Sequence, residues 1–161
     1  DDYGSKYNVN INGQRIGQVS KSSVYMYNVR IYGDAGNDTI SVNANLPLRL
    51  EAHGGSGEDT IWGTRYNDYL YGDGDGDKIY GQDGNDYIDG GAGNDSVLSG
   101  GNGSDTILGG TGNDTLYGDG GRDYLFGNIG ADIFMDYDGQ DSVTDSGGNN
   151  QWYRSNRWIR F

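Results

Sequence analysis

The sequence contains no cysteine, which excludes a disulfide framework, a zinc–thiolate site and a thiol nucleophile. It also lacks any run of about 18 apolar residues, so we expect no segment that spans a membrane. Only 33% of its 161 residues are hydrophobic. A chain of this length can form one domain, but it cannot build that domain around an ordinary globular core.

Basic residues and glutamates are scarce as well. The chain has 11 lysines and arginines against 24 acidic residues, and its formal net charge is −13. Glu51 and Glu58 are the only glutamates, so aspartate carries nearly all of the negative charge. This balance argues against a nucleic-acid partner, because phosphates require a basic protein surface. It favours the binding of cations.

No group of residues indicates catalysis. His53 is the only histidine, and without a cysteine or a second histidine we expect it at a corner of a coil rather than as a ligand or base. The serines have neither a nucleophile elbow nor a triad context. The carboxylates are periodic, so no general acid–base pair stands out. We therefore expect the chain not to be an enzyme.

Glycine, in contrast, is abundant, with 31 residues, and it recurs in a repeat of nine residues. Residues 109–117, for example, read GGTGNDTLY. Eleven copies occur between residues 33 and 144, and the copies that follow residue 54 are in phase except for one extra residue, which we place at Ser99. Position one is glycine in ten copies, and position four is glycine in nine.

Two further positions complete the repeat. Position six is aspartate in every copy: Asp38, Asp59, Asp68, Asp77, Asp86, Asp95, Asp105, Asp114, Asp123, Asp132 and Asp141. Position eight is always apolar: Ile40, Ile61, Leu70, Ile79, Ile88, Val97, Ile107, Leu116, Leu125, Phe134 and Val143. Aspartate and glycine are also common turn formers, but turn chemistry alone would accept asparagine or serine at position six.

Elementary geometry explains why these residue types recur at this spacing. Glycines at positions one, two and four permit positive φ angles and close backbone approach, so six residues can turn sharply with carbonyl groups pointing inward. The aspartate that follows supplies hard anionic oxygens, and Ca²⁺ takes six to eight oxygen ligands in irregular geometry. Positions seven to nine alternate as a short strand, which directs position eight to the interior.

Nine residues thus form a turn and a strand, or half a coil, and two repeats close one coil. The result is a pair of facing parallel sheets, with loops n and n+2 stacked on the same side. We expect almost no helix. We expect strands near residues 39–41, 60–62, 69–71, 78–80, 87–89, 96–98, 106–108, 115–117, 124–126, 133–135 and 142–144. Residues 42–53 read as a half-coil without a calcium loop, with Leu46, Leu48 and Leu50 as its strand.

The repeat resembles G-G-x-G-x-D-x-U-x, the pattern of the RTX, or hemolysin-type, family, over residues 33–144. The resemblance implies an all-β fold, a right-handed parallel β-roll, with each Ca²⁺ held between two stacked loops. It implies as ligands the eleven position-six aspartates and backbone carbonyls of the position-four glycines Gly57, Gly84, Gly93, Gly103, Gly112, Gly121 and Gly130. It also implies a bacterial protein that is secreted by the type I pathway.

The resemblance further implies that each ion is shared by the aspartates of loops n and n+2. The candidate pairs are Asp59 with Asp77, Asp68 with Asp86, Asp77 with Asp95, Asp86 with Asp105, Asp95 with Asp114, Asp105 with Asp123, Asp114 with Asp132, and Asp123 with Asp141. A ninth pair, Asp38 with Asp59, requires the first two loops to stack. Tyr66 and Asp75 replace position-four glycines, which weakens the case for sites in their loops, although Asp75 is itself a candidate ligand. We expect seven to nine ions.

The N-terminal flank, residues 1–32, falls outside the repeat. Asn12-Gly13 favours a β-hairpin with a type I′ turn. Residues 24–31 read as a strand that leads into the first coil.

The C-terminal flank, residues 145–161, follows the array. Residues 145–151 contain no apolar side chain, so we expect them only to cross over. Trp152 or Trp158 should then pack over the final coil as a cap, because the open end of a repeat array needs one. A partner-binding tail and part of a secretion signal are the alternatives.

Aromatic residues form a second pattern on the outward positions. Position nine in coils of one parity carries Trp62, Tyr80, Leu98, Tyr117 and Met135, and position seven in the other parity carries Tyr69, Tyr87, Thr106 and Tyr124. Such ladders stabilise neighbouring strands of a sheet. They could alternatively form an exposed face for carbohydrate, for self-association or for an adjoining domain.

Three functions are consistent with the sequence. The leading one is a calcium-responsive folding module that assists secretion, because so few apolar side chains cannot offset chain entropy and aspartate repulsion without metal. The second is an extracellular adhesin, matrix or carbohydrate-binding module that uses the aromatic faces. The third is an accessory domain of a larger secreted enzyme.

Overall fold

The computed structural model describes residues 6–11, 14–20, 27–42, 47–138, 140–154 and 157–160, and the side chains of 28–42, 47–138 and 140–154. The described residues form seventeen strands and no helix. Ten strands form one sheet: β1 (Lys6–Ile11), β2 (Gln14–Ser20), β4 (Thr39–Val42), β6 (Thr60–Trp62), β8 (Lys78–Asp83), β10 (Val97–Gly103), β12 (Thr115–Gly121), β14 (Ile133–Asp136), β16 (Gln151–Arg154) and β17 (Arg157–Arg160). Seven form the other: β3 (Tyr27–Tyr32), β5 (Leu48–Ser56), β7 (Tyr69–Gly74), β9 (Tyr87–Ala92), β11 (Thr106–Thr111), β13 (Tyr124–Ile129) and β15 (Ser142–Thr144).

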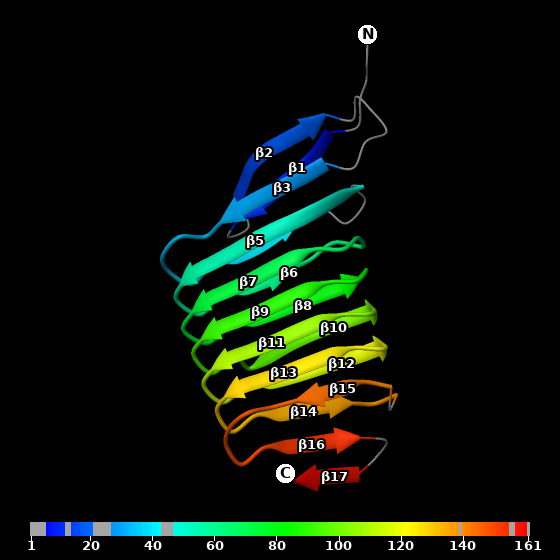
Figure 1. The fold of residues 1–161 in the computed structure, drawn as a ribbon. Coiled ribbons are helices and arrows are strands. Elements are labelled where there is room, and N and C mark those ends of the chain that lie inside the picture. Colours follow the sequence, from blue (N-terminus) through cyan, green and yellow to red (C-terminus); the bar gives the residue numbers. More distant parts are fainter. Residues whose placement is uncertain are drawn as a thin grey trace.

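From β3 to β16, successive strands alternate between the two sheets, and each pairs in parallel with the strand two steps along the chain (Figure 1). The register places equal repeat positions side by side. Ile61 lies beside Ile79 in the ten-stranded sheet, and Ile107 lies beside Leu125 in the seven-stranded sheet. Consecutive repeats are therefore joined by loops and not by antiparallel pairing, and the predicted parallel β-roll is confirmed.

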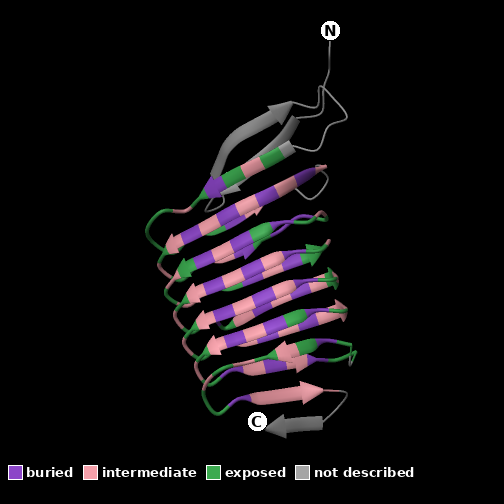
Figure 2. Cartoon of the chain, viewed as in Figure 1, coloured by how far each residue is buried: buried purple, intermediate pink, exposed green. Residues whose placement is uncertain are grey.

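The core is one cluster of apolar side chains that both sheets contribute. Buried and more exposed residues alternate along the strands (Figure 2). Nine of the position-eight side chains, among them Ile79 and Leu116, and also Leu98 have no exposed surface at all. This period of two follows from the strand geometry, which directs successive side chains to opposite faces.

One position-eight assignment is wrong. Leu98, not Val97, is the buried residue of β10, and it pairs with Ile79 and Leu116. The backbone of Ser96 still bonds in the regular way, donating to the carbonyl of Asp77 at 3.1 Å. The extra residue of this repeat is therefore absorbed between Ser96 and Val97, ahead of the strand. Ser99 then takes the regular position nine.

The N-terminal flank extends both sheets. β1 and β2 form the predicted hairpin, with Ile11 paired to Gln14, while the turn residues themselves lie outside the described residues. β1 runs antiparallel to β4, and β3 pairs in parallel with β5. The strand expected over 24–31 is Tyr27–Tyr32, and positions 24–26 lie outside the described part.

The half-coil predicted over 42–53 is present in part. β5 buries Leu48 and Leu50 as expected, and it also buries Ala52. Leu46 lies outside the described residues. Because β5 pairs with β3 on one side and β7 on the other, it fills the seven-stranded sheet where the sequence has no calcium loop.

The C-terminal flank continues the roll, contrary to the expectation of a simple crossover over 145–151. β16 pairs in parallel with β14, and Trp152 lies beside Phe134 in the position-eight register. Trp152 packs against the core, as predicted. β17 then pairs antiparallel with β16, and the side chain of Trp158 on it lies outside the described part. Residues 145–153 occupy one more nine-residue interval in the same register as the repeats, but Asn150 stands at position six, where the eleven copies have aspartate.

Candidate metal centre

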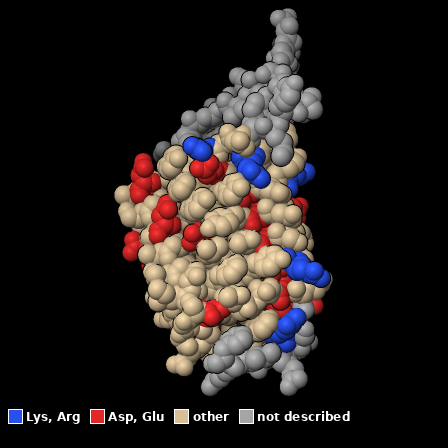
Figure 3. Space-filling model, viewed as in Figure 1, with Lys and Arg blue, Asp and Glu red and all other residues tan. Residues whose placement is uncertain are grey.

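The loops form two rows along opposite edges of the roll. The first row leads from the seven-stranded to the ten-stranded sheet and contains residues 33–38, 54–59, 72–77, 90–95, 109–114 and 127–132. The second row leads back and contains residues 63–68, 81–86, 100–105, 118–123 and 136–141. On the face shown in Figure 3, acidic side chains lie mainly toward the two edges and basic ones are few.

The position-six aspartates link neighbouring loops of a row. All eleven are at most 7% exposed. In nine cases Oδ1 of one aspartate accepts a hydrogen bond from the backbone N–H of the aspartate in the preceding loop of the same row, at 2.6–3.1 Å. The linked residues are Asp38–Asp59–Asp77–Asp95–Asp114–Asp132 in the first row and Asp68–Asp86–Asp105–Asp123–Asp141 in the second. The structure thus brings together every pair that the sequence predicted, including Asp38 with Asp59.

The second carboxylate oxygen of these residues has no such partner. Within the described residues, no group donates a hydrogen bond to the buried Oδ2 of Asp59, Asp77, Asp86, Asp95, Asp105, Asp114, Asp123, Asp132 or Asp141. A buried carboxylate oxygen without a donor or a counter-ion is strongly unfavourable. A cation next to Oδ2 removes that cost, and a hard cation such as Ca²⁺ prefers oxygen ligands.

The position-one glycines create the space in which these oxygens converge. A methyl group added to Gly109 would lie 2.5 Å from Oδ2 of Asp114 and 2.8 Å from the carbonyl oxygen of Gly127 in the next loop of the row. At Gly118 it would meet Oδ2 of both Asp123 and Asp141. Glycine is needed here for close approach. None of the position-one glycines has a positive φ angle, so the positive φ expected at positions one, two and four occurs only at positions two and four.

Positions two and four hold the left-handed conformation that turns the carbonyl groups. The eight position-four glycines that the structure describes, including the seven candidate carbonyl ligands, have φ between 109° and 157°. The carbonyl oxygens of several of them, among them Gly84, Gly93 and Gly112, lie close to position four of the next loop in the row, as that of Gly103 does to Gly121. Five residues other than glycine also adopt a positive φ at position two, and most are of types that tolerate it: Asp34, Asp73, Gln82, Asp119 and Asn128. Thr64 and Tyr137, at the same position, do not.

Burial and mutual repulsion make the ionised aspartates unfavourable in the chain alone. Burial, and then the charges of Asp68 and Asp105, raise the pKa of Asp86 to about 8. Burial raises the pKa of Asp77 and Asp114 to about 7, and neighbouring aspartates add to the shift. A divalent cation between the loops would reverse these shifts, because it favours the charged form of every carboxylate around it.

Loop 63–68 differs from the others, in line with its unusual residues. Thr64 is fully buried at position two. Its backbone N–H donates to Oδ2 of Asp68 at 2.5 Å, and its hydroxyl donates to Oδ1 at 3.1 Å. Both oxygens of Asp68 therefore have donors within the chain. In loop 72–77, Asp75 is exposed and accepts a hydrogen bond from the N–H of Gly57, so it fastens one loop to the next.

Asparagines at position five form a second ladder, which the sequence argument missed. The side-chain oxygen of Asn94 accepts a hydrogen bond from the N–H of Asn113 at 2.7 Å, and Asn113 accepts one from Ala131 at 2.8 Å. Asn37, Asn67 and Asn85 bond in the same way. Asparagine recurs at position five in five of the eleven copies, and this recurrence was the feature of the sequence that could have predicted the ladder. These contacts hold the loops at their stacking distance without using the aspartates.

The last loop of the second row gathers additional carboxylates. Oxygens of Asp136, Asp138 and Asp141 lie within 4.8 Å of one another. Asp136 stands at position one, where the other copies have glycine. It is fully buried and forms an ion pair with Arg154 of β16 at 3.2 Å. This end of the row therefore has two carboxylates, those of Asp136 and Asp138, and one arginine in addition to the regular aspartate.

Aromatic side chains lie on the outer faces, as predicted. Trp62 is 40% exposed and stacks on Tyr80 at 4.1 Å, and Tyr117 is half-buried on the same ladder. Leu98 does not belong to this ladder, because it is buried and Ser99 holds its place. On the other sheet His53 stacks between Tyr32 and Tyr71, at 5.0 and 4.5 Å. The single histidine is thus part of an aromatic stack, and its Nδ1 also lies 3.2 Å from Asp73.

Comparison with known proteins gives one match. The family model of the RTX calcium-binding nonapeptide repeat matches four segments, residues 27–44, 53–85, 66–97 and 99–134, which together cover more than half of the chain. No curated protein and no solved structure matches. Among the described residues there is no helix long and apolar enough to cross a membrane.

Proposed function

Because the chain belongs to the RTX calcium-binding nonapeptide repeat family, we propose that it is a module that folds when several Ca²⁺ ions bind outside the cell. The observation that carries this proposal is the set of nine buried Oδ2 atoms that receive no hydrogen bond in the described chain. We assign the position-six aspartates as ligands, together with carbonyl oxygens of the position-four glycines. Seven to nine ions in two rows would fit the nine linked aspartate pairs.

Folding and metal binding should be one event, for an electrostatic reason. The roll concentrates carboxylates in two rows of a chain whose net charge is −13. About eight Ca²⁺ ions would more than offset that charge, and each would bridge two loops of a row. Without them, the few apolar side chains of the core must oppose both this repulsion and the conformational entropy of the chain.

This coupling suits a protein that is exported. Where Ca²⁺ is scarce, as inside a cell, the chain would remain unfolded and able to pass through a secretion channel. Where Ca²⁺ reaches millimolar levels, it would fold. We therefore propose a bacterial, extracellular module of residues 33–144 with 1–32 and 145–161 as its ends, secreted by the type I pathway and without catalytic activity of its own.

Far-UV circular dichroism during a Ca²⁺ titration tests this function. We expect the β-sheet signal to appear cooperatively with Ca²⁺ and to disappear on addition of EDTA. Mg²⁺ at the same concentration is the control, because it demands near-octahedral geometry and keeps its waters, so it should not induce the fold. An unchanged spectrum in EDTA would show that folding does not depend on the metal.

The exposed stack of Trp62 and Tyr80 favours a second candidate function, binding of a glycan, an adjoining domain or another copy of the chain. Exposed aromatic rings offer flat apolar surfaces for such partners. A glycan array and analytical ultracentrifugation of the calcium-loaded protein would detect these activities. Trp62→Ala should abolish them and leave the calcium titration unchanged. The sequence of the complete gene would show whether the module accompanies a secreted enzyme.

A further inference from the structure

The series of hydrogen bonds that links the position-six aspartates of a row continues for one further bond at two places. At the N-terminal end of the second row, the N–H of Leu50 donates to Oδ1 of Asp68 at 2.7 Å. At the C-terminal end of the first row, the N–H of Asp132 donates to Oδ1 of Asn150 at 2.6 Å. In each case one partner is not an aspartate. These two steps are the ends of the rows, and both differ chemically from the regular ones.

At the first of these ends, Thr64 supplies hydrogen-bond donors where the regular loops have none. Its N–H and hydroxyl donate to the two oxygens of Asp68, as described above. The hydroxyl also lies 3.2 Å from the carbonyl oxygen of Leu48 in the preceding half-coil. One buried side chain thus contacts oxygens on both sides of the gap between the half-coil and loop 63–68, which is the arrangement expected of a bridging cation.

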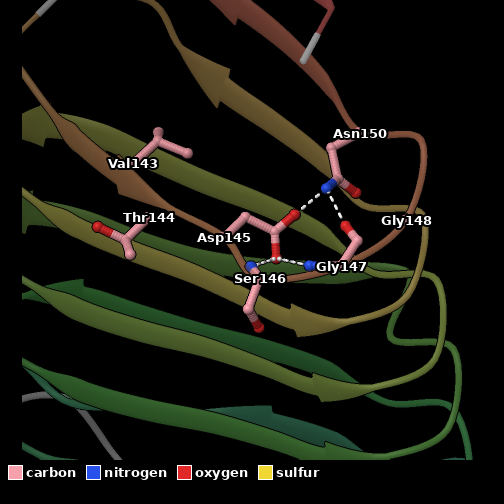
Figure 4. A pocket seen from close by; sticks show the side chains of 7 residues that line it. All are labelled: Val143, Thr144, Asp145, Ser146, Gly147, Gly148 and Asn150. Atoms are coloured by element: carbon pink, nitrogen blue, oxygen red, sulfur yellow. Dashed lines mark hydrogen bonds between the residues drawn. The ribbon is translucent and has the colours of Figure 1, made fainter.

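At the second end, Asn150 has an amide nitrogen where the regular loops have Oδ2. The side chain is only 5% exposed. Its Nδ2 donates to Oδ2 of Asp145 and to the carbonyl oxygen of Gly147 (Figure 4). An amide N–H₂ group cannot act as a metal ligand, but it can satisfy two oxygens of its own loop. Gly148, at position four, keeps the positive φ of the regular loops. The loop therefore has the regular backbone without the regular carboxylate.

We propose that Thr64 and Asn150 take the place of a calcium ion at opposite ends of the two rows. This inference rests on the proposed calcium function. At one end of each row, the ions then stop one loop inside the fold, and the end loop there is held by a neutral donor that needs no metal. At these two ends the last ion is covered by a loop instead of facing solvent.

The number of bound ions tests this assignment. Asn150→Asp replaces the donor by a carboxylate and should raise the count by one Ca²⁺ per chain, measured by native mass spectrometry and by isothermal titration calorimetry. Asn149→Asp is the matched control, since it adds the same charge at an exposed position of the same loop and should leave the count unchanged. An equal count in the wild type and N150D would overturn the proposal, and so would failure of N150D to fold in saturating Ca²⁺. A wild type that binds no Ca²⁺ would instead contradict the proposed function.

Thr64 can be tested separately from the C-terminal end. Thr64→Val keeps the side-chain shape but removes the hydroxyl donor, so we expect the Ca²⁺ concentration at half-folding to rise several-fold. Thr64→Ser keeps the hydroxyl and should restore the wild-type midpoint. Equal midpoints for T64V and T64S would show that the hydroxyl does not hold the end of the second row.

Discussion

The position of an aspartate within its row should determine how much stability its removal costs. Asp95 lies in the middle of the first row, where it is linked to Asp77 on one side and to Asp114 on the other. Asp141 ends the second row and is linked only to Asp123. Asp95→Ala should therefore disrupt two calcium sites and Asp141→Ala only one.

The two substitutions share one local cost, which makes their difference informative. Each leaves a buried backbone N–H without its acceptor, that of Asp77 or of Asp123, at about 1–3 kcal/mol. At Ca²⁺ about 100-fold above the dissociation constant, each lost site removes about 2.7 kcal/mol of stability. Asp95→Ala should thus destabilise the roll by about 2.7 kcal/mol more than Asp141→Ala. The carboxylates of Asp136 and Asp138 near Asp141 should widen this gap, because they can still hold a cation.

Urea unfolding at fixed Ca²⁺, followed by far-UV circular dichroism, measures this difference. The concentration of Ca²⁺ should be held about 100-fold above the wild-type folding midpoint. Comparable slopes of the free energy of unfolding against urea would show that both variants still unfold from the same compact state. Equal losses for the two variants, or a larger loss for Asp141→Ala, would refute ion sharing between neighbouring aspartates.

Three further predictions concern protonation, the end of the roll and the register of β10. Burial raises the pKa of Asp86 to about 8 and of Asp77 to about 7, above the unfolded value near 3.9. The ion-free roll therefore retains protons that the unfolded chain loses, and its stability should fall as pH rises from about 4 to 8. In EDTA, dichroism should show more β-structure at pH 5 than at pH 8, and the reverse order would contradict these pKa shifts. Deleting residues 151–161 should raise the Ca²⁺ midpoint because Phe134 loses its neighbour Trp152, and an unchanged midpoint would mean that the segment is not a cap. Leu98→Asp should prevent folding because it buries a charge, at a cost of several kcal/mol, whereas Val97→Asp should be tolerated at a half-exposed site. Equal effects would mean that the extra residue lies elsewhere.

The sequence sufficed to predict the coil and its chemistry because both depend on a short period. An aspartate at position six and an apolar residue at position eight recur every nine residues, and parallel stacking then follows from the length of half a coil. The paired aspartates, the buried row and the outward position of Trp62 all follow from that phase. No long-range information was needed, because each coil contacts mainly its neighbours.

The sequence did not predict two kinds of feature. In one, two neighbouring residues fit the repeat pattern equally well. In the other, a repeat position is occupied by a residue type that the pattern does not include. Val97 and Leu98 are both apolar, so only strand pairing reveals which one points inward. Asn150 fails the aspartate criterion although its loop is regular. Thr64 also contacts the carbonyl of Leu48, which is sixteen residues away and comes close only when the coils stack.

The hydrogen bond between Asp59 and Asp77 joins residues eighteen apart, and this interval sets the unit by which such a protein can change in length. Removing residues 72–89 would delete one complete coil and bring Tyr71 directly before Gly90, with every later loop still on its own edge. Removing nine residues would instead exchange the two edges for the whole remainder of the chain. Every later strand would then move to the other sheet, so outward side chains that belong to the seven-stranded sheet would lie on the face of the ten-stranded sheet, and the reverse. Gains and losses of even numbers of repeats should therefore be far better tolerated than odd ones. The array can change in length by whole coils while each strand stays in its own sheet and each loop on its own edge.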